Sequence, residues 1–272
     1  MKSVINKKFK VLNINNPFRY LIIKNFLDLD YLKKINNYFD KVPSTLYVRE
    51  SVPQTTIQKL DIYNLKEKDQ LEIECVPNFS ETNKSLRNVE IKKIKLEKTP
   101  NGQQGINRVF IDTNNIHFFP ELVHLKDELV SKPFSEFLKK NLNKDISETR
   151  LKIELLRNKK NHFLLPHEDC VEKVVSFLIY LNFNNQSKDC GTDIYELKNK
   201  KYDKITMNRK FSDFKKVKTI PFENNNCFVF STMKNSWHGL DPGKNFNDRR
   251  VIQLNWITKD YSSYKDCFTI KT

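Results

Sequence analysis

The sequence predicts a mainly β protein of the α+β class, with its helices confined to the first 148 residues. Two observations lead to this prediction. Apolar residues at helical spacing occur only before residue 148, and beyond it short apolar runs alternate with turn residues as far as residue 257. Strands of this kind close into an antiparallel sandwich or barrel, and the jelly roll is one standard way to close them. We therefore expect residues 149–272 to form the core and residues 1–148 to support it, as one integrated domain.

Two helical patterns occur in the supporting segment. The apolar stretch Tyr20–Ile23 indicates a strand, which leads into apolar residues at helical spacing from Leu27 to Phe39. A second pattern, from Leu122 to Leu142, predicts two helices or one helix broken at Pro133. Each pattern has one apolar face, so we expect these helices to brace the core.

The core segment begins with a period of two. Leu151, Ile153 and Leu155 point to one side of the expected strand, and Lys152 and Glu154 point to the other. Further strand-like runs are Val174–Leu181, Thr192–Leu197, Val217–Ile220, Cys227–Ser231 and Val251–Ile257. Helix signals are absent from this segment, which favours a jelly roll core over a mixed α/β arrangement.

Composition limits the partners that we expect. The chain has 272 residues with 48 Lys+Arg against 33 Asp+Glu, and the resulting charge of +15 consists mostly of scattered lysines typical of a solvated surface. No nucleic-acid-binding motif accompanies this charge, so we do not expect a nucleic-acid partner. Five cysteines without a CxxC pair favour a reducing compartment, and no apolar run approaches the roughly 20 residues that span a bilayer. We expect a cytoplasmic protein without membrane contact, and the oligomeric state stays open.

Three residues have the character of a metal site. In His167-Glu168-Asp169 an imidazole and a carboxylate project to the same side of an extended segment, and His238 follows a later apolar strand. Two histidines and one carboxylate leave open positions on the metal, which suits non-haem Fe(II) and oxygen chemistry. A closed zinc site would need a fourth ligand; no cysteine has an obvious pairing with this set, although Cys170 adjoins it.

An arginine pair supplies a candidate anion site. Alternation along the last strand places Arg250 on the same face as Ile252, Leu254 and Trp256, and places Arg249 on the other face. An arginine on an apolar face is costly unless it meets an anion, and its guanidinium fits a carboxylate bidentately. Arg250 is therefore the candidate carboxylate clamp, and Arg249 is the alternative if the register differs by one residue.

Together these residues resemble a known family. The order His167-x-Asp169, His238 and Arg250 is similar to that of the Fe(II)- and 2-oxoglutarate-dependent dioxygenases, whose core is a double-stranded β-helix or jelly roll. The prolyl-hydroxylase-like branch is the most similar, over roughly residues 151 to 256. The resemblance extends to Tyr180-Leu181-Asn182, Gly191-Thr192-Asp193-Ile194-Tyr195, Phe228-Val229-Phe230 and Ser236-Trp237-His238-Gly239.

The resemblance implies a role for each residue. It makes His167, Asp169 and His238 the ligands of Fe(II) and Arg250 the partner of the distal carboxylate of 2-oxoglutarate. Tyr180 matches a position from which related enzymes hydrogen-bond the same carboxylate. The family often has Ser or Thr two residues after the arginine, whereas this chain has Ile there. The second hydrogen bond to the co-substrate is therefore unassigned, which makes Tyr180 more important to the hypothesis.

The implied function is the hydroxylation of a small molecule, sugar or amino-acid derivative, with release of succinate and carbon dioxide. The cofactors would be Fe(II) and the co-substrate 2-oxoglutarate, with ascorbate as an optional addition. Two alternatives stay open at this point. The oxygenase could act on a protein side chain or a nucleic acid, with demethylation as another outcome of the same step. The chain could instead be a cupin-like metal-binding jelly roll without oxygenase activity.

Overall fold

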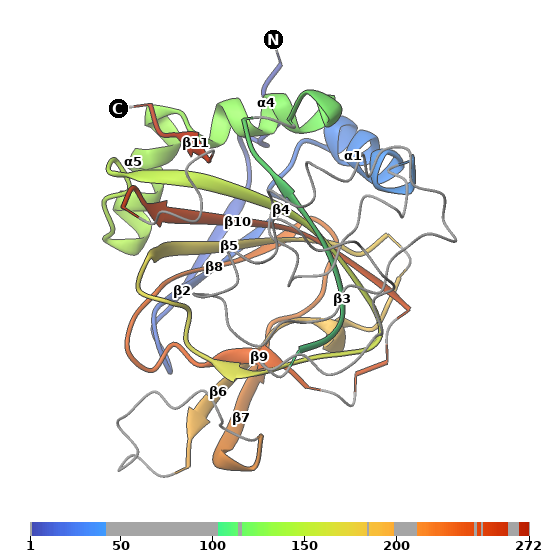
Figure 1. Cartoon of the computed structure of the whole chain (residues 1–272), viewed down its shortest axis with the longest axis vertical. Helices are drawn as coiled ribbons and strands as arrows, with labels where there is room; N and C mark the ends of the chain where they lie inside the picture. The colour runs from blue at the N-terminus through green and yellow to red at the C-terminus, as the bar shows by residue number, and fades with distance from the viewer. Residues whose placement is uncertain are drawn as a thin grey trace, which may run out of the picture.

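The computed structural model describes residues 2–41, 103–113, 116–183, 185–198, 211–241, 244–245, 247–260 and 267–271. Its strands are β1 (Lys10–Ile14), β2 (Tyr20–Lys24), β3 (Gln103–Ile111), β4 (Thr149–His167), β5 (Lys173–Leu181), β6 (Asp193–Leu197), β7 (Phe214–Thr219), β8 (Asn226–Ser231), β9 (His238–Leu240), β10 (Asp248–Thr258) and β11 (Phe268–Thr269). Its helices are α1 (Leu29–Lys41), α4 (Pro120–Leu129) and α5 (Lys132–Leu142), with 3-10 turns η4 (Ile116–Phe118), η5 (Lys188–Cys190) and η6 (Phe211–Asp213). Figure 1 shows the strands as a curved antiparallel sheet with the helices along its outer side.

The strand order is that of a jelly roll. The sheet runs β1-β2-β8-β5-β10-β4-β9-β6-β7, and β3 and β11 also pair with β4. This sheet folds over into two layers, a larger one that contains β10 and a smaller one that contains β9. Strand β4 belongs to both layers, because its first part pairs with β10 and its end pairs with β9. Beyond β4 the chain alternates between the layers: β5, β8 and β10 lie in one, and β6, β7 and β9 in the other. This alternation confirms the predicted mainly β fold with a double-stranded β-helix core.

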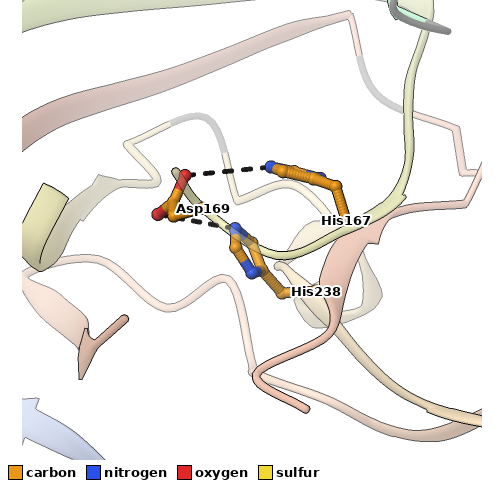
Figure 2. Close-up of side chains that lie close together, drawn as sticks. All are labelled: His167, Asp169 and His238. Atoms are coloured by element: carbon orange, nitrogen blue, oxygen red, sulfur yellow. Dashed lines mark ion pairs between the residues drawn. The ribbon is translucent and has the colours of Figure 1, made fainter. Parts of the chain in front are cut away.

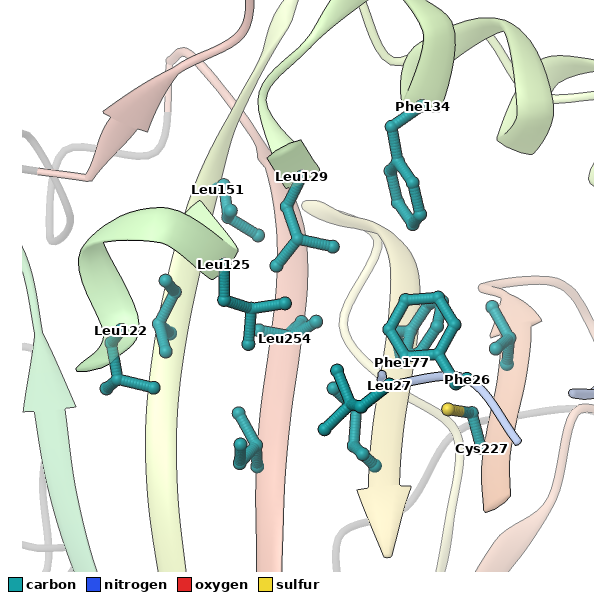
Figure 3. Packing of buried hydrophobic residues seen from close by; sticks show 14 of the residues in the cluster. Phe26, Leu27, Leu122, Leu125, Leu129, Phe134, Leu151, Phe177, Cys227 and Leu254 are labelled. Atoms are coloured by element: carbon teal, nitrogen blue, oxygen red, sulfur yellow. The ribbon is translucent and has the colours of Figure 1, made fainter. Parts of the chain in front are cut away.

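Two hydrophobic cores lie on opposite faces of the larger layer. The outer core joins the helices to the sheet, and Figure 3 shows Leu122, Leu125 and Leu129 of α4 packed beside Leu151 and Leu254 of the strands. The inner core lies between the two layers, where Tyr180 and Val251 of the larger layer meet Ile194 and Leu240 of the smaller one. Each strand of the larger layer therefore sends alternate residues to the helices and to the interior of the barrel.

Several elements follow the sequence closely. The expected strand at residues 20–23 and the helix after it are β2 and α1, and the amide groups of Asp30 and Tyr31 donate to Asp28 at the start of that helix. The second helical pattern forms two helices, α4 and α5, with Pro133 in the first turn of α5. The expected brace is thus present: both helices bury leucines against the sheet.

Other elements differ from the expectation. Strand β3 starts at Gln103 and contains Gly105, although glycine is more typical of loops than of strands; its pairing shifts between Gln104 and Ile106, so Gly105 lies at a bulge. Strand β9 has only three residues, too few for a periodic pattern to reveal. Strands from both segments of the chain, β2 and β8 among them, pair in one sheet.

Within the described residues, no helix combines the length and the apolar character needed to cross a bilayer.

The outer core should dominate the stability of the fold. Leu125 is fully buried between α4 and the sheet, whereas Leu29 at the start of α1 is 66% exposed. We expect Leu125→Ala to lower the free energy of unfolding by about 2–5 kcal/mol because it leaves a cavity, and Leu29→Ala to change it by about 0.5 kcal/mol or less. Urea denaturation followed by circular dichroism measures both values. Equal losses in the two variants would contradict this packing.

Candidate active site

The two histidines of the site are cross-strand partners. His167 is the last residue of β4, His238 is the first residue of β9, and the two are paired in register. Their ring centroids are 4.3 Å apart. The chain turns after β4, so Asp169 faces both rings (Figure 2): its Oδ1 is 4.0 Å from Nε2 of His167 and its Oδ2 is 4.0 Å from Nε2 of His238. One ligand atom from each residue lies within 4.8 Å of the others, so the three side chains could hold one metal ion.

The protonation states of these groups suit metal binding. Nδ1 of His238 is 3.0 Å from the carbonyl oxygen of Ser236, which can only accept, so Nδ1 carries the proton and Nε2 keeps its lone pair toward Asp169. Burial and the neighbouring His167 lower the pKa of His238 to about 4, although Asp169 acts in the opposite direction. The ring is therefore neutral at physiological pH, as a metal ligand must be.

The carboxylate of Asp169 is ionised. Burial by itself would raise its pKa, but Lys173 and the two histidines outweigh burial, and the pKa of Asp169 lies well below its usual range. The ammonium group of Lys173 is 2.6 Å from Oδ1 of Asp169. Asp169 in turn raises the pKa of Lys173 above its usual value, against the effect of burial. The site thus holds a carboxylate and an ammonium group in direct contact.

A chain of buried polar groups extends from the site across the inner face of the sheet. The hydroxyl of Ser176 on β5 donates to Oδ2 of Asp169 at 2.5 Å and lies 3.1 Å from Oδ1 of Asn255 on β10. The amide of Asn255 donates to Glu154 on β4 at 3.2 Å, and Glu154 forms an ion pair with Lys152 at 2.7 Å. Because each group in this chain has a partner, the orientation of Asp169 is fixed from behind.

The structure places Arg250 on the helix side of the sheet. Its guanidinium donates to Asp248 at 2.9 and 3.0 Å and to Asn36 of α1 at 3.4 Å. Arg157 binds the same carboxylate at 2.6 and 2.7 Å. Arg250 and the apolar residues of β10 share the face that lies under the helices. The anion expected to bind Arg250 is therefore a side chain of the protein itself, Asp248.

The arginine that faces the interior of the barrel is Arg249, the alternative named from the sequence. It is 5% exposed, and it donates to the carbonyl oxygen of Cys190 at 2.8 Å and to Oδ1 of Asn158 at 2.7 Å. Its guanidinium also lies over the rings of Tyr180 and Phe222, at 5.5 and 5.2 Å from their centroids. These partners are neutral, and among the residues that the structure describes no carboxylate forms an ion pair with Arg249.

The polar groups of Tyr180 and Asn158 next to this arginine differ in how they are hydrogen-bonded. The hydroxyl of Tyr180 donates to Oγ1 of Thr192 at 2.7 Å and accepts from the backbone amide of Thr192 at 3.3 Å. Burial raises the pKa of Tyr180, although Arg249 acts in the opposite direction, so the phenol stays protonated. The amide nitrogen of Asn158 is buried and has no hydrogen-bond partner among the described residues. A buried cation and a buried unpaired donor side by side suit an anionic ligand.

The structure brings together the three residues that the sequence proposes as metal ligands, and it adds supporting residues that sequence reasoning missed. Lys173, Ser176, Asn158 and Thr192 each bond to a predicted site residue or to Arg249. A signal existed for Ser176, which is a polar residue within the apolar run of β5, and for Asn158, which falls on the polar side of the alternation in β4. His117 and His124 lie elsewhere, in η4 and α4.

Comparisons with known proteins give distant structural likeness. No protein-family model matches the sequence, and no curated protein matches it either. A prolyl hydroxylase from Trichoplax adhaerens, solved with a peptide fragment of the hypoxia inducible factor oxygen degradation domain, is 16% identical with a TM-score of 0.47, over 88% of this chain and 84% of its own. HygX from Streptomyces hygroscopicus, solved with nickel, 2-oxoglutarate and hygromycin B, is 10% identical with a TM-score of 0.48, over 90% and 85%. A Pseudomonas putida prolyl-4-hydroxylase is 14% identical with a TM-score of 0.37, over 57% and 73%. Likeness at this level does not assign a function. The function is therefore inferred from the side chains of this protein.

If His167, Asp169 and His238 bind a metal ion, the ion should raise the thermal stability of the protein, which can be measured. A ligand that binds only the folded protein, present at about 100 times its Kd, adds about 2.7 kcal/mol to the free energy of unfolding. We expect Mn(II) to raise the Tm of the metal-free protein by several degrees, and a chelator to reverse the rise. Asp169→Ala should abolish this response, whereas Asp145→Ala, which removes a surface carboxylate paired with Lys139, should keep it. A response to Mn(II) that survives Asp169→Ala would place the metal elsewhere.

Proposed function

We propose that this chain is an Fe(II)- and 2-oxoglutarate-dependent oxygenase that hydroxylates a small molecule. One observation carries the proposal: inside one jelly roll barrel, His167, Asp169 and His238 converge on a single point, and Arg249 on the same interior face has no carboxylate partner among the described residues. The first feature fits a metal with open coordination positions. The second fits the free carboxylate of a dicarboxylic acid.

The ligand set fits ferrous iron. Two neutral imidazole nitrogens and one carboxylate oxygen leave the remaining positions of an octahedral ion open, and a set without a thiolate does not favour a closed zinc site. Bound Fe(II) would supply the oxidising chemistry, in which dioxygen is the oxidant: 2-oxoglutarate would lose carbon dioxide and take one oxygen atom to become succinate, and the other oxygen atom would enter a C–H bond of the substrate. The chain contributes the orientation of the ligands: Ser236 fixes the tautomer of His238, and Ser176 fixes the carboxylate of Asp169.

The co-substrate clamp in this proposal is Arg249 rather than Arg250. Burial of a cation among neutral partners costs free energy, which is also seen in the lowered pKa of Arg249, and a carboxylate would offset that cost. Asn158 lies beside Arg249, and its unpartnered amide nitrogen supplies a further donor for the same carboxylate, in place of the residue two positions after the arginine. Tyr180 also flanks Arg249, but its hydroxyl donates to Thr192, so it takes the role that the sequence proposed for it only by turning from Thr192 to the bound carboxylate.

The same residues support the proposed outcome and the proposed substrate class. Related halogenating enzymes lack the metal-binding carboxylate so that halide can bind, and the presence of Asp169 therefore favours hydroxylation. A small substrate is supported by the exposure of the three ligands: the side chain of His167 is 35% exposed, whereas those of Asp169 and His238 are 5% and 8% exposed. The site is therefore accessible mainly on the side of His167, which suits a small group that approaches the metal. A base of a nucleic-acid duplex suits it less well, because the base would first have to be extruded from the duplex.

Co-substrate binding separates the two arginines. We expect metal-loaded protein to bind 2-oxoglutarate, and Arg249→Met to weaken that binding by about 100-fold, because losing one partner of a buried charge pair costs about 2–5 kcal/mol. Arg250→Met is the matched control, since it removes a buried arginine from the next position of the same strand and leaves Asp248 paired with Arg157. Calorimetric titration of both variants, loaded with Mn(II), measures the effect. If only Arg250→Met lost affinity, the clamp would be Arg250.

Turnover separates the oxygenase from a metal-binding module without activity. Purified protein with Fe(II), ascorbate and 2-oxoglutarate should form succinate, and His167→Ala should abolish it because one metal ligand is lost. Mass spectrometry of the reaction measures succinate directly. A protein that binds zinc or nickel tightly, shows no affinity for 2-oxoglutarate and forms no succinate would instead be a cupin-like module.

A further inference from the structure

Both oxygens of the metal-binding carboxylate are already engaged. Oδ1 of Asp169 accepts from the ammonium group of Lys173 at 2.6 Å, and Oδ2 accepts from the hydroxyl of Ser176 at 2.5 Å. A carboxylate has about four lone-pair sites, so each oxygen keeps capacity on the side that faces the histidines. The two donors differ in kind, because Ser176 is neutral and Lys173 carries a full positive charge.

Lys173 stands apart from the ordinary supports of a metal ligand. It lies at the start of β5, four residues after Asp169, and its side chain is 25% exposed while Asp169 and Ser176 are buried. Carboxylates that bind metals are commonly hydrogen-bonded by neutral groups, which orient them without opposing the cation. An ammonium group on the same carboxylate orients it too, but it repels a divalent ion that binds beside it.

We propose that Lys173 is a positioning residue that holds Asp169 ready for the metal and keeps the affinity of the centre for divalent ions low. This proposal rests on the proposed function, because it takes His167, Asp169 and His238 as the metal ligands. Orientation of Asp169 does not depend on Lys173 alone, since Ser176 and the polar chain behind it through Asn255 hold the other oxygen. Removing the charge of Lys173 therefore removes the repulsion and leaves the carboxylate in place.

The direction of the effect distinguishes this role from a purely structural one. A residue that only supported the fold would lower metal affinity when it was replaced. Replacing Lys173 by a neutral residue should raise metal affinity, because the repulsion between its ammonium group and a divalent ion exceeds the contribution of one hydrogen bond to orientation. Low affinity has a chemical consequence for the centre: the metal exchanges with the medium, and the protein persists in a metal-free form in which Lys173 balances the charge of Asp169.

The test is calorimetric titration of metal-free protein with Mn(II) at pH 8. We expect Lys173→Met, which removes charge and hydrogen bond, and Lys173→Gln, which keeps a neutral donor, each to bind Mn(II) at least tenfold more tightly than the unmodified chain. Lys173→Arg keeps the charge and should stay within about threefold of the unmodified chain. The matched control is Lys139→Met, which removes one lysine from a lysine–aspartate ion pair on the surface of α5 and should leave the affinity unchanged.

Each other outcome contradicts a defined part of the account. Unchanged or weaker binding by both neutral variants overturns the role of Lys173, and so does a failure of both to fold, because the lysine would then serve the fold. Absence of Mn(II) binding by the unmodified chain contradicts the metal centre and the proposed function with it. Tighter binding by the neutral variants together with no affinity for 2-oxoglutarate supports the role of Lys173 and contradicts the oxygenase alone.

Discussion

The pairing of the end of β4 with β9 is the interaction on which the site depends. It sets His167 opposite His238, and the turn that follows β4 brings Asp169 back to both rings. Strand β4 can supply this pairing only because it runs through both layers of the jelly roll, next to β10 at its start and next to β9 at its end. A shift of one residue would turn one histidine to the other face of its strand and separate the ligands.

The two faces of the larger layer divide the structure into support and chemistry. The helix side is apolar and holds its arginine, Arg250, in a cluster with Asp248 and Arg157. The barrel side carries two groups of buried polar side chains: Asp169 with the residues behind it on β5, β10 and β4, and Arg249 with Asn158. Adjacent residues in β10 therefore have different partners: Arg250 has an aspartate within the chain, whereas Arg249 has neutral partners, which fits the proposed binding of a carboxylate.

Sequence patterns predicted the larger part of the fold, because the helices and most strands bury one periodic face. They also singled out His167, Asp169 and His238 as candidate metal ligands, and the structure brings these three side chains together. The sequence could not predict which face of β10 points into the barrel. Alternation showed that Arg249 and Arg250 lie on opposite faces of the strand, but both faces are buried, so periodicity does not distinguish the barrel side from the helix side. Lys173 was equally hidden, because its contact with Asp169 depends on the path of the turn between β4 and β5.

A crystal structure of the protein grown with Mn(II) and 2-oxoglutarate, with anomalous diffraction from the manganese, tests the central claim most directly. The account predicts one anomalous peak bonded to Nε2 of His167, Nε2 of His238 and a carboxylate oxygen of Asp169, with the distal carboxylate of 2-oxoglutarate on Arg249. A manganese ion at any other group of side chains, or a dicarboxylate bound away from the barrel interior, would contradict it.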